Sequence, residues 1–178
     1  PEEKQNHYLK IVLEETGRLS KLANDLVDLS SAQAGKMVIE KCDFDINDLI
    51  RESIEVMEPR FKQKSIKVNA IFADEVTIVN ADPNKIKRVL QNLIDNAIKF
   101  SFNGGEIIVE VEEKNKKVFV HVKDNGKGIT KDEMKHVFER FFKADTSRGL
   151  DKTGVGLGLS IVKEFINAHG ERVEVKDR

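Results

Sequence analysis

Three polar residues of one helical segment, Asn92, Asn96 and Lys99, have the types and spacing of a metal–phosphate cradle. An α-helix turns about 100° per residue, so these side chains fall within roughly 60° of one another on one stripe. Amide oxygens ligate hard cations such as Mg²⁺, and a lysine ammonium is a point charge for phosphate. A solvated helix face is the default interpretation of such a stripe. The other segments of the sequence must therefore decide between that interpretation and a metal–phosphate site. The opposite face is apolar, with Ile86, Val89, Leu90, Leu93 and Ala97.

A second segment, Asp124 to Ile129, follows a strand in which valines alternate with polar residues. A carboxylate at a strand end only accepts hydrogen bonds, so it would select a ligand with N–H groups, such as the exocyclic amine of adenine. Gly126 and Gly128 allow positive φ and close approach of a ring to the backbone. Because Asp-Asn-Gly is also strong turn chemistry, a plain turn is the alternative.

A third segment, Gly154 to Ser160, is a glycine-rich turn that runs into a helix. Free backbone N–H groups at a helix N-terminus attract phosphate. The segment is not a P-loop, which needs Gly-Lys-Ser/Thr, nor a dinucleotide fingerprint, which needs a preceding strand. A glycine-rich hinge without a ligand is the alternative.

A fourth segment, Phe138 to Phe142, precedes residues 143–153, which are polar, lack periodicity and are expected to form a mobile loop. Its aromatic residues either belong to the core or anchor that loop. Arg140, Lys143 and Arg148 are candidate phosphate contacts, although a solvated loop is the simpler interpretation of each.

Residues 4–33 are predicted to form one long helix with an apolar seam that steps by three and four, ending at Gly35. The breadth of the seam favours self-association in a helical bundle over docking on its own domain. Its members are Leu9, Val12, Thr16, Leu19, Ala23, Leu26 and Ser30, widened by Leu13, Leu22, Val27 and Leu29.

The remaining elements are predicted from caps and alternation. Asp45 caps a helix over 46–63 after a linker over 35–43, and Asp82-Pro83 opens the helix that carries the asparagines. Strands are expected at 66–72, 76–79, 106–112, 118–124 and 171–176, and further helices at 131–139 and 157–168. Helices mixed with antiparallel hairpins, without a regular βαβ repeat, predict an α+β fold in which helices cover one face of a mixed sheet.

Composition limits the class of protein. The chain has 178 residues, and its 30 basic and 31 acidic residues nearly cancel, which gives no electrostatic argument for binding nucleic acid. No apolar run is long enough to span a membrane, and Cys42 cannot form an internal disulfide, which fits a reducing compartment. Both ends look cut, so we expect a cytoplasmic fragment of a longer protein. This expectation is compatible with a full-length protein that is anchored in a membrane.

Together the four segments resemble the N, G1, F and G2 boxes of the catalytic ATP-binding domain of sensor histidine kinases, in their order and spacing. The motifs are Asn-x-x-x-Asn-Ala-x-Lys-Phe, Asp-x-Gly-x-Gly, Phe-x-x-Phe and Gly-x-Gly-x-Gly-Leu. This family belongs to the wider ATPase superfamily that includes gyrase, and the resemblance implies the two-layer Bergerat-type fold over residues 41–178. Residues 1–40 resemble the second helix of the dimerisation and phosphotransfer domain.

The resemblance implies a role for each matching residue. Asn96 matches the magnesium ligand, Asn92 and Lys99 match phosphate-side contacts, and Asp124 matches the aspartate that reads adenine. Residues 143–153 correspond to the ATP lid. Further nucleotide-binding positions implied in the boxes are Phe100, Gly126, Gly128, Ile129, His136, Arg140, Gly154, Gly156, Leu157, Gly158 and Leu159. Asp95 could orient the attacking nucleophile, but a solvated role is the simpler expectation.

The family's phosphoacceptor box, a His-Glu-Leu-Arg-Thr-Pro-like sequence, does not occur in this chain. His7 has the wrong neighbours, His121 is expected to point outward on a strand, and His169 matches a structural helix end. We therefore expect a protein-histidine kinase domain that binds ATP and Mg²⁺ and transfers the γ-phosphoryl group to a histidine outside this chain. The implied partners are the acceptor helix of the full-length kinase, a response regulator receiver and a second copy of the stem. The alternative is an ATP-binding scaffold or regulatory ATPase without autokinase activity.

Overall fold

The computed structural model describes residues 2–144 and 154–176. The chain divides into two compact units, Pro1–Met37 and Val38–Arg178. Within the described ranges, no helix is both long enough and apolar enough to cross a membrane.

The first unit is one helix, α1 (Glu2–Gln33), as the seam predicts. Gly35 follows it with φ +63°, and the Gly35 N–H donates to the carbonyl of Ala32 at 3.0 Å, so the helix ends where a left-handed residue is available. Apolar side chains of the seam are exposed along much of the helix; they include Leu9, Val12, Leu13, Leu19, Leu26 and Val27.

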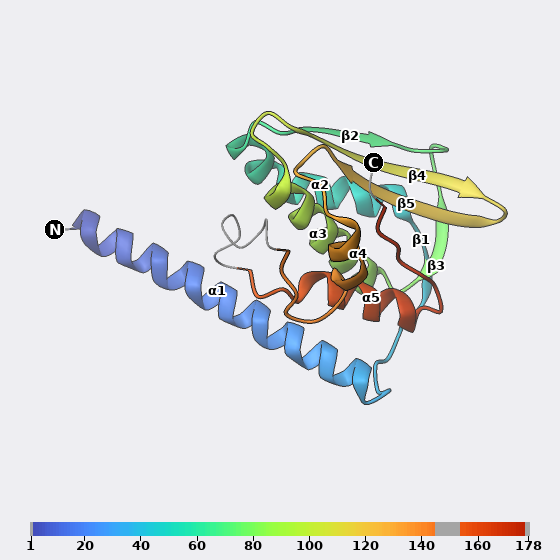
Figure 1. Ribbon diagram of the computed structural model, residues 1–178, viewed down its shortest axis with the longest axis horizontal. Coiled ribbons are helices and arrows are strands. Elements are labelled where there is room, and N and C mark those ends of the chain that lie inside the picture. The colour runs from blue at the N-terminus through green and yellow to red at the C-terminus, as the bar shows by residue number, and fades with distance from the viewer. Residues whose placement is uncertain (1, 145–153, 177–178) are drawn as a thin grey trace. The chain divides into compact units, whose positions relative to one another are not determined.

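The second unit mixes helices with two small sheets, which confirms the predicted α+β class. Strand β4 lies between β2, to which it is parallel, and β5, to which it is antiparallel, while β1 pairs antiparallel with β3. The elements in chain order are β1 (Cys42–Asp45), α2 (Ile46–Gln63), β2 (Lys67–Ile71), β3 (Ile78–Ala81), α3 (Pro83–Phe100), β4 (Glu106–Lys114), β5 (Lys117–Asp124), α4 (Lys131–His136) and α5 (Gly158–Ala168) (Figure 1).

Both long helices of this unit begin at the aspartates that the sequence indicates. The Asp82 carboxylate accepts from the backbone N–H groups of Asn84 and Lys85 at 3.0 and 3.1 Å, with Pro83 in the first turn of α3. Asp45 caps α2 in the same way and also accepts from the N–H of Thr77 at 3.0 Å. Because Asp45 contacts Thr77, the start of α2 is also joined to the segment that enters β3.

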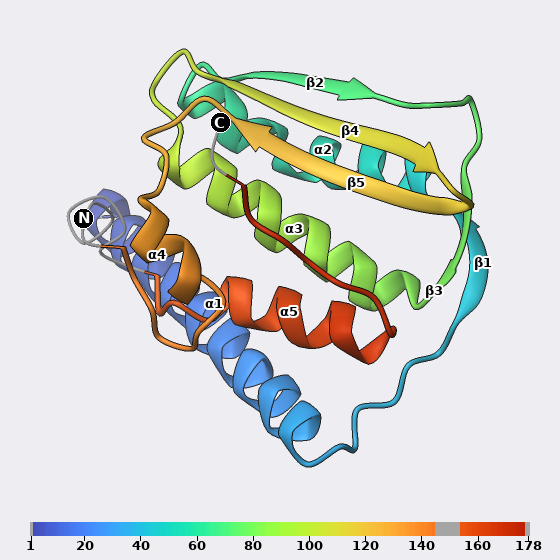
Figure 2. The same ribbon diagram turned by 45° about the vertical axis from the view of Figure 1, so that its right-hand side comes forward.

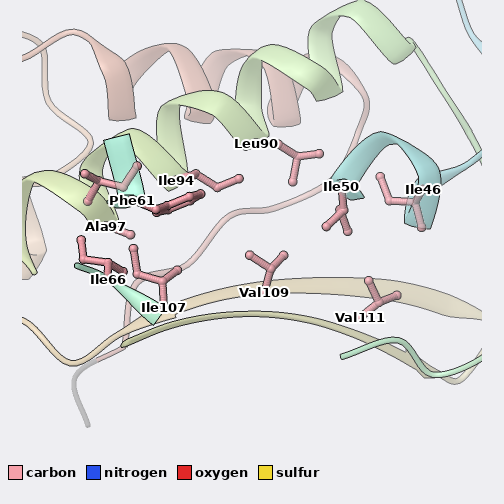
Figure 3. Close-up of a cluster of buried hydrophobic side chains, with 11 residues drawn as sticks. Ile46, Ile50, Phe61, Ile66, Leu90, Ile94, Ala97, Ile107, Val109 and Val111 are labelled. Carbon is pink, nitrogen blue, oxygen red and sulfur yellow. The ribbon is translucent and has the colours of Figure 1, made fainter. Parts of the chain in front are cut away.

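The core lies between the three-stranded sheet and helices α2 and α3, which cover one face of it (Figure 2). Alternate residues of β4 point into it, and fully buried Ile94 of α3 and Ile50 of α2 meet them from the helical side (Figure 3). Burial of such side chains is what holds α3 against the sheet, since Ile-to-Ala changes in a core cost about 2–5 kcal/mol. The strand side of the cluster includes Ile107, Val109 and Val111.

Helix α5 packs beside α3 on the side away from the sheet (Figure 2). Phe165 of α5 is fully buried, with the ammonium of Lys85 4.8 Å from its ring centroid. His169, just past α5, lies against the first turn of α3, where its Nε2 accepts from the Asp82 N–H at 3.0 Å. The expectation that His169 is a structural helix end agrees with this contact.

Four details differ from the sequence-based predictions. The strand expected at 76–79 is β3, which begins and ends two residues later, at Ile78–Ala81. The expected strand at 171–176 is wrong, because those residues carry no strand ladder; apolar alternation alone cannot make a strand without a neighbour that supplies hydrogen bonds. The linker expected over 35–43 is shorter, because Cys42 and Asp43 already belong to strand β1, which pairs with β3. Helix α4 begins with a capping box between Thr130 and Glu133. It ends at His136 and not, as the sequence predicts, at 139.

Candidate functional site

Asn92 lies on α3 at the base of the site, with only 4 % of its surface exposed. Its side-chain Nδ2 is buried and has no hydrogen-bond partner among the described residues. An unmade hydrogen bond at a buried amide costs about 1–3 kcal/mol, so such a group suits a ligand that brings an acceptor. A phosphate oxygen is such an acceptor.

About one and two turns further along α3, respectively, Asn96 and Lys99 are half-buried. The Lys99 ammonium lies 3.2 Å from Oδ2 of Asp95, and Arg60 of α2 contacts the other oxygen of the same carboxylate. The expectation that Asp95 is solvated is therefore wrong, since only 8 % of it is exposed and it holds two cations. The burial of the Asp95 carboxylate is compensated by one cation of its own helix, Lys99, and one of α2, Arg60.

Asp124 is the last residue of β5, directly opposite fully buried Ile107 of β4. Paired residues of an antiparallel ladder point to the same face, so Asp124 is directed to the helical side of the sheet. One of its oxygens accepts from the N–H of Gly126 at 2.9 Å. That bond holds the half-buried carboxylate in place and leaves its other oxygen as an acceptor for a ligand.

Gly126 brings the Asp124 loop against the end of α3. A Cβ at Gly126 would lie 2.3 Å from the carbonyl oxygen of Phe100, a distance that no side chain tolerates. The Phe100 carbonyl also accepts from the N–H of Lys127 at 3.4 Å. The N box and the G1 box therefore meet at their backbones, and Gly128 follows with φ +69°.

The F and G2 boxes are joined in a similar way. The N–H of Phe141 donates to the carbonyl of Gly156 at 2.9 Å. Gly156 has φ +79°, and a Cβ there would lie 2.8 Å from the carbonyl oxygen of Phe142. Both the backbone conformation and the contact require glycine at this position.

The G2 box ends at the N-terminus of α5, next to Asn92. A Cβ at Gly158 would lie 3.4 Å from Oδ1 of Asn92. Residue Leu157, which precedes the helix, is buried and makes no side-chain cap, so the first-turn N–H groups of α5 have no capping acceptor of that kind. An uncapped N-terminus beside an amide donor favours an anion.

The remaining predicted site residues have other partners or lie elsewhere in the boxes. Exposed His136 contacts Glu139 at 2.7 Å, and Arg140 contacts Glu164 of α5 at 3.6 Å. Lys143 is described and has a partner of its own, whereas Arg148 and residues 145–153 lie outside the described residues. The half-buried predicted residues Ile129, Gly154 and Leu159 belong to the G1 and G2 boxes.

Two residues that support the site were not predicted, Arg60 and Lys64, one turn apart at the end of α2. The Lys64 ammonium donates to the carbonyls of Ile98, Lys99 and Ser101 at 2.8, 2.9 and 3.2 Å, which caps the C-terminus of α3. Only their i, i+4 spacing was visible in the sequence, and that spacing does not reveal which helix they contact.

Residues 81–178, more than half of the chain, match the family described as histidine kinase-, DNA gyrase B-, and HSP90-like ATPase. The chain belongs to this family. It is 31% identical over 177 residues to the alginate biosynthesis sensor protein KinB of Pseudomonas aeruginosa, a match that covers 99% of this chain and 29% of KinB. The chain thus spans less than a third of that relative.

Solved structures of histidine kinases have the same fold. The catalytic domain of ThkA superposes with a TM-score of 0.65 at 33% identity, covering 72% of this chain and 81% of that domain. ThkA in complex with the response regulator protein TrrA gives 0.71 at 28% identity, covering 92% of this chain and 44% of that chain. Full-length ShkA in complex with AMPPNP superposes with a TM-score of 0.79 at 27% identity. The match covers 94% of this chain and 34% of the ShkA chain.

The chain therefore contains the ATP-binding catalytic domain of a two-component sensor histidine kinase. The buried, unpartnered Asn92 donor and the uncapped α5 N-terminus fit the phosphates of ATP. Among the described residues, no group of three or more His, Cys, Asp or Glu side chains could hold a metal by itself. Mg²⁺ is commonly bound by one or two protein oxygens together with substrate phosphates, and the half-buried Asn96 on the same helix face suits that mode.

Proposed function

We propose that this domain binds Mg²⁺·ATP between α3, the Asp124 loop and the start of α5, and transfers the γ-phosphoryl group to a histidine outside this chain. The observation that carries the proposal is the position of Asn92, whose buried amide lies against Gly158 at the uncapped N-terminus of α5. No residue of the described chain satisfies this donor, which supports a ligand that brings an acceptor, such as a phosphate oxygen.

Each box residue has a role in the proposal. Asp124 accepts a hydrogen bond from the exocyclic amine of adenine, Asn92 and Lys99 contact phosphates, and Asn96 ligates Mg²⁺, which neutralises charge on the transferring group. Phosphoryl transfer needs little covalent chemistry from the protein, so these residues act by positioning and electrostatics. The other proposed nucleotide contacts are Phe100, Gly126, Gly128, Ile129, His136, Arg140, Gly154, Gly156, Leu157, Gly158 and Leu159. Of these, His136 and Arg140 must leave Glu139 and Glu164 to contribute.

The first forty residues are proposed to be part of a dimerisation and phosphotransfer stem, with the catalytic domain over 41–178. Support comes from α1, whose seam residues Leu9, Val12, Leu19 and Leu26 are exposed although apolar. A second copy of the stem would bury them. The receiver domain of a response regulator is the proposed phosphoryl recipient, by analogy with the complex of ThkA and TrrA. The proposed compartment of the domain is the cytoplasm, where a free, exposed thiol such as that of Cys42 stays reduced.

The experiment is to incubate the chain with γ-labelled ATP, Mg²⁺ and a supplied acceptor-helix domain from a related kinase. We expect acid-labile label on the acceptor histidine and none on the four histidines of this chain. Asn96→Ala should abolish the labelling, whereas Asn84→Ala, an exposed position on the same helix, should not.

Free phosphate without labelled acceptor would support a regulatory ATPase instead. Binding of ATP with neither product would support a scaffold. Stable label on His7 would overturn the proposal that the acceptor lies outside this chain.

A further inference from the structure

One buried carboxylate, Asp95, is shared by two cations from different helices. Arg60 of α2 contacts Oδ1, and Lys99 of α3 lies 3.2 Å from Oδ2. Only 11 % of the Asp95 side chain is exposed, against 43 % for Arg60 and 28 % for Lys99. The carboxylate is thus the least hydrated member of the trio, and it needs compensation most.

The turn of α2 that carries Arg60 also holds the backbone of Lys99. Lys64, four residues after Arg60, donates to three carbonyls at the end of α3, including that of Lys99 at 2.9 Å. These carbonyls have no intrahelical partner at a helix C-terminus, so Lys64 fixes where the last turn of α3 lies.

We infer that Arg60 is a positioning residue for Lys99: by neutralising Asp95 it leaves the Lys99 ammonium available to a nucleotide phosphate. This rests on the proposed function, in which Lys99 contacts phosphate. Without Arg60, the buried Asp95 charge would be compensated by Lys99 more strongly, because a carboxylate with one cation attracts it more than a carboxylate with two. Lys99 would then have to give up a stronger ion pair with Asp95 than the one it has in the unaltered chain before it could contact a phosphate.

The test is a set of equilibrium titrations with Mg²⁺·ATP and, separately, with adenosine. Arg60→Met should weaken ATP binding roughly fivefold, as expected for a charge interaction of a partly exposed group. Adenosine binding should not change, because adenosine has no phosphate for Lys99 to contact. Lys62→Met, which removes an exposed lysine between the two supporting residues, is the matched control and should leave both affinities unchanged.

The double variant Arg60→Met/Asp95→Asn separates positioning from a merely structural role. With the carboxylate neutral, Arg60 has nothing to compensate, so the double variant should bind ATP as Asp95→Asn alone does. This comparison stands even where Arg60→Met does not fold, since neither of the two proteins compared contains a charged Asp95 that lacks Arg60.

Two results would overturn the inference: unchanged ATP binding in Arg60→Met, or a loss that persists in full beside Asp95→Asn. An equal loss for adenosine would also contradict it, because that indicates general damage to the domain. Failure of the proposed function looks different: the unaltered chain would not bind Mg²⁺·ATP, or Lys99→Met would bind it as well as the unaltered chain.

Discussion

Asn92 and Gly158 meet where the N box and the G2 box come together, and a Cβ on Gly158 would lie 3.4 Å from the Asn92 amide oxygen. One residue lies in the middle of α3 and the other begins α5, so their contact depends on the packing of these two helices. The amide nitrogen of Asn92 is left as a buried donor beside the helix N-terminus. On this pairing we base the proposed phosphate side of the site.

Gly126→Ala should remove both stability and ATP binding. Its Cβ would lie 2.3 Å from the Phe100 carbonyl, a backbone atom that cannot move without shifting the end of α3. We expect the free energy of unfolding to fall by about 1–3 kcal/mol, the usual cost of overpacking, with ATP affinity lost in the same variant. Chemical denaturation and nucleotide titration measure the two effects.

The control for this prediction is Gly17→Ala on α1, where an added Cβ meets nothing within 4 Å. Alanine is the better helix former, so this change should not destabilise the chain or alter ATP affinity. Normal binding by Gly126→Ala would contradict the close junction of the two boxes.

His169→Ala should loosen α5 from the start of α3. The Nε2 of His169 accepts from the Asp82 N–H at 3.0 Å, so its Nδ1 carries the proton and donates to the Phe165 carbonyl at 2.7 Å. Removing the ring leaves a buried N–H unsatisfied, which costs about 1–3 kcal/mol of unfolding free energy. Urea denaturation monitored by circular dichroism measures this loss.

Two comparisons test whether the hydrogen bond is responsible. His169→Gln places an amide oxygen at a similar reach and should recover part of the loss. His121→Ala, on the outer face of β5, should change stability by less than about 0.5 kcal/mol. Equal losses at both histidines would contradict the account.

The pair of Glu110 and Lys123 on the outer face of the sheet should stabilise the fold only above acidic pH. The hydrogen bond from Lys123, together with its charge, lowers the pKa of Glu110 below its ordinary value. A lowered folded-state pKa means that the stabilisation is present above the unfolded-state pKa and is lost as the pH falls through the folded-state pKa. Lys123→Met should therefore be less stable than the parent at neutral pH, and the difference should shrink on acidification.

Denaturation at several pH values measures this difference, with Lys114→Met, an exposed lysine at the other end of the hairpin, as the control. Added salt should also reduce it, since the pair is exposed. If the stability difference between Lys123→Met and the parent grew toward acidic pH, the predicted direction of the pH dependence would be contradicted.

Features encoded locally were predictable from the sequence. Asp45 and Asp82 cap the helices that follow them because an N-cap needs only its own first turn. The asparagine stripe and the glycine boxes were visible for the same reason, since each occupies a few consecutive residues. The expected role of His169 at a helix end also followed from its immediate neighbours.

Features that depend on distant partners were missed. Strand β1 is four residues long and exists through its pairing with β3, in which Cys42 lies opposite Ala81, 39 positions later in the chain. The expected strand at 171–176 has the right alternation without a ladder among the described residues. Asp95 looked solvated because its partner Arg60 lies 35 residues earlier, on another helix.

The most direct test of the ATP site is the affinity of Asp124→Asn for Mg²⁺·ATP, measured by calorimetry beside the unaltered chain. The new amide still accepts from the Gly126 N–H through its oxygen, but it presents a donor where adenine needs an acceptor. We expect ATP affinity to fall at least about tenfold, with no change in Asp132→Asn, an exposed aspartate on α4. Unchanged ATP binding in Asp124→Asn would contradict the account.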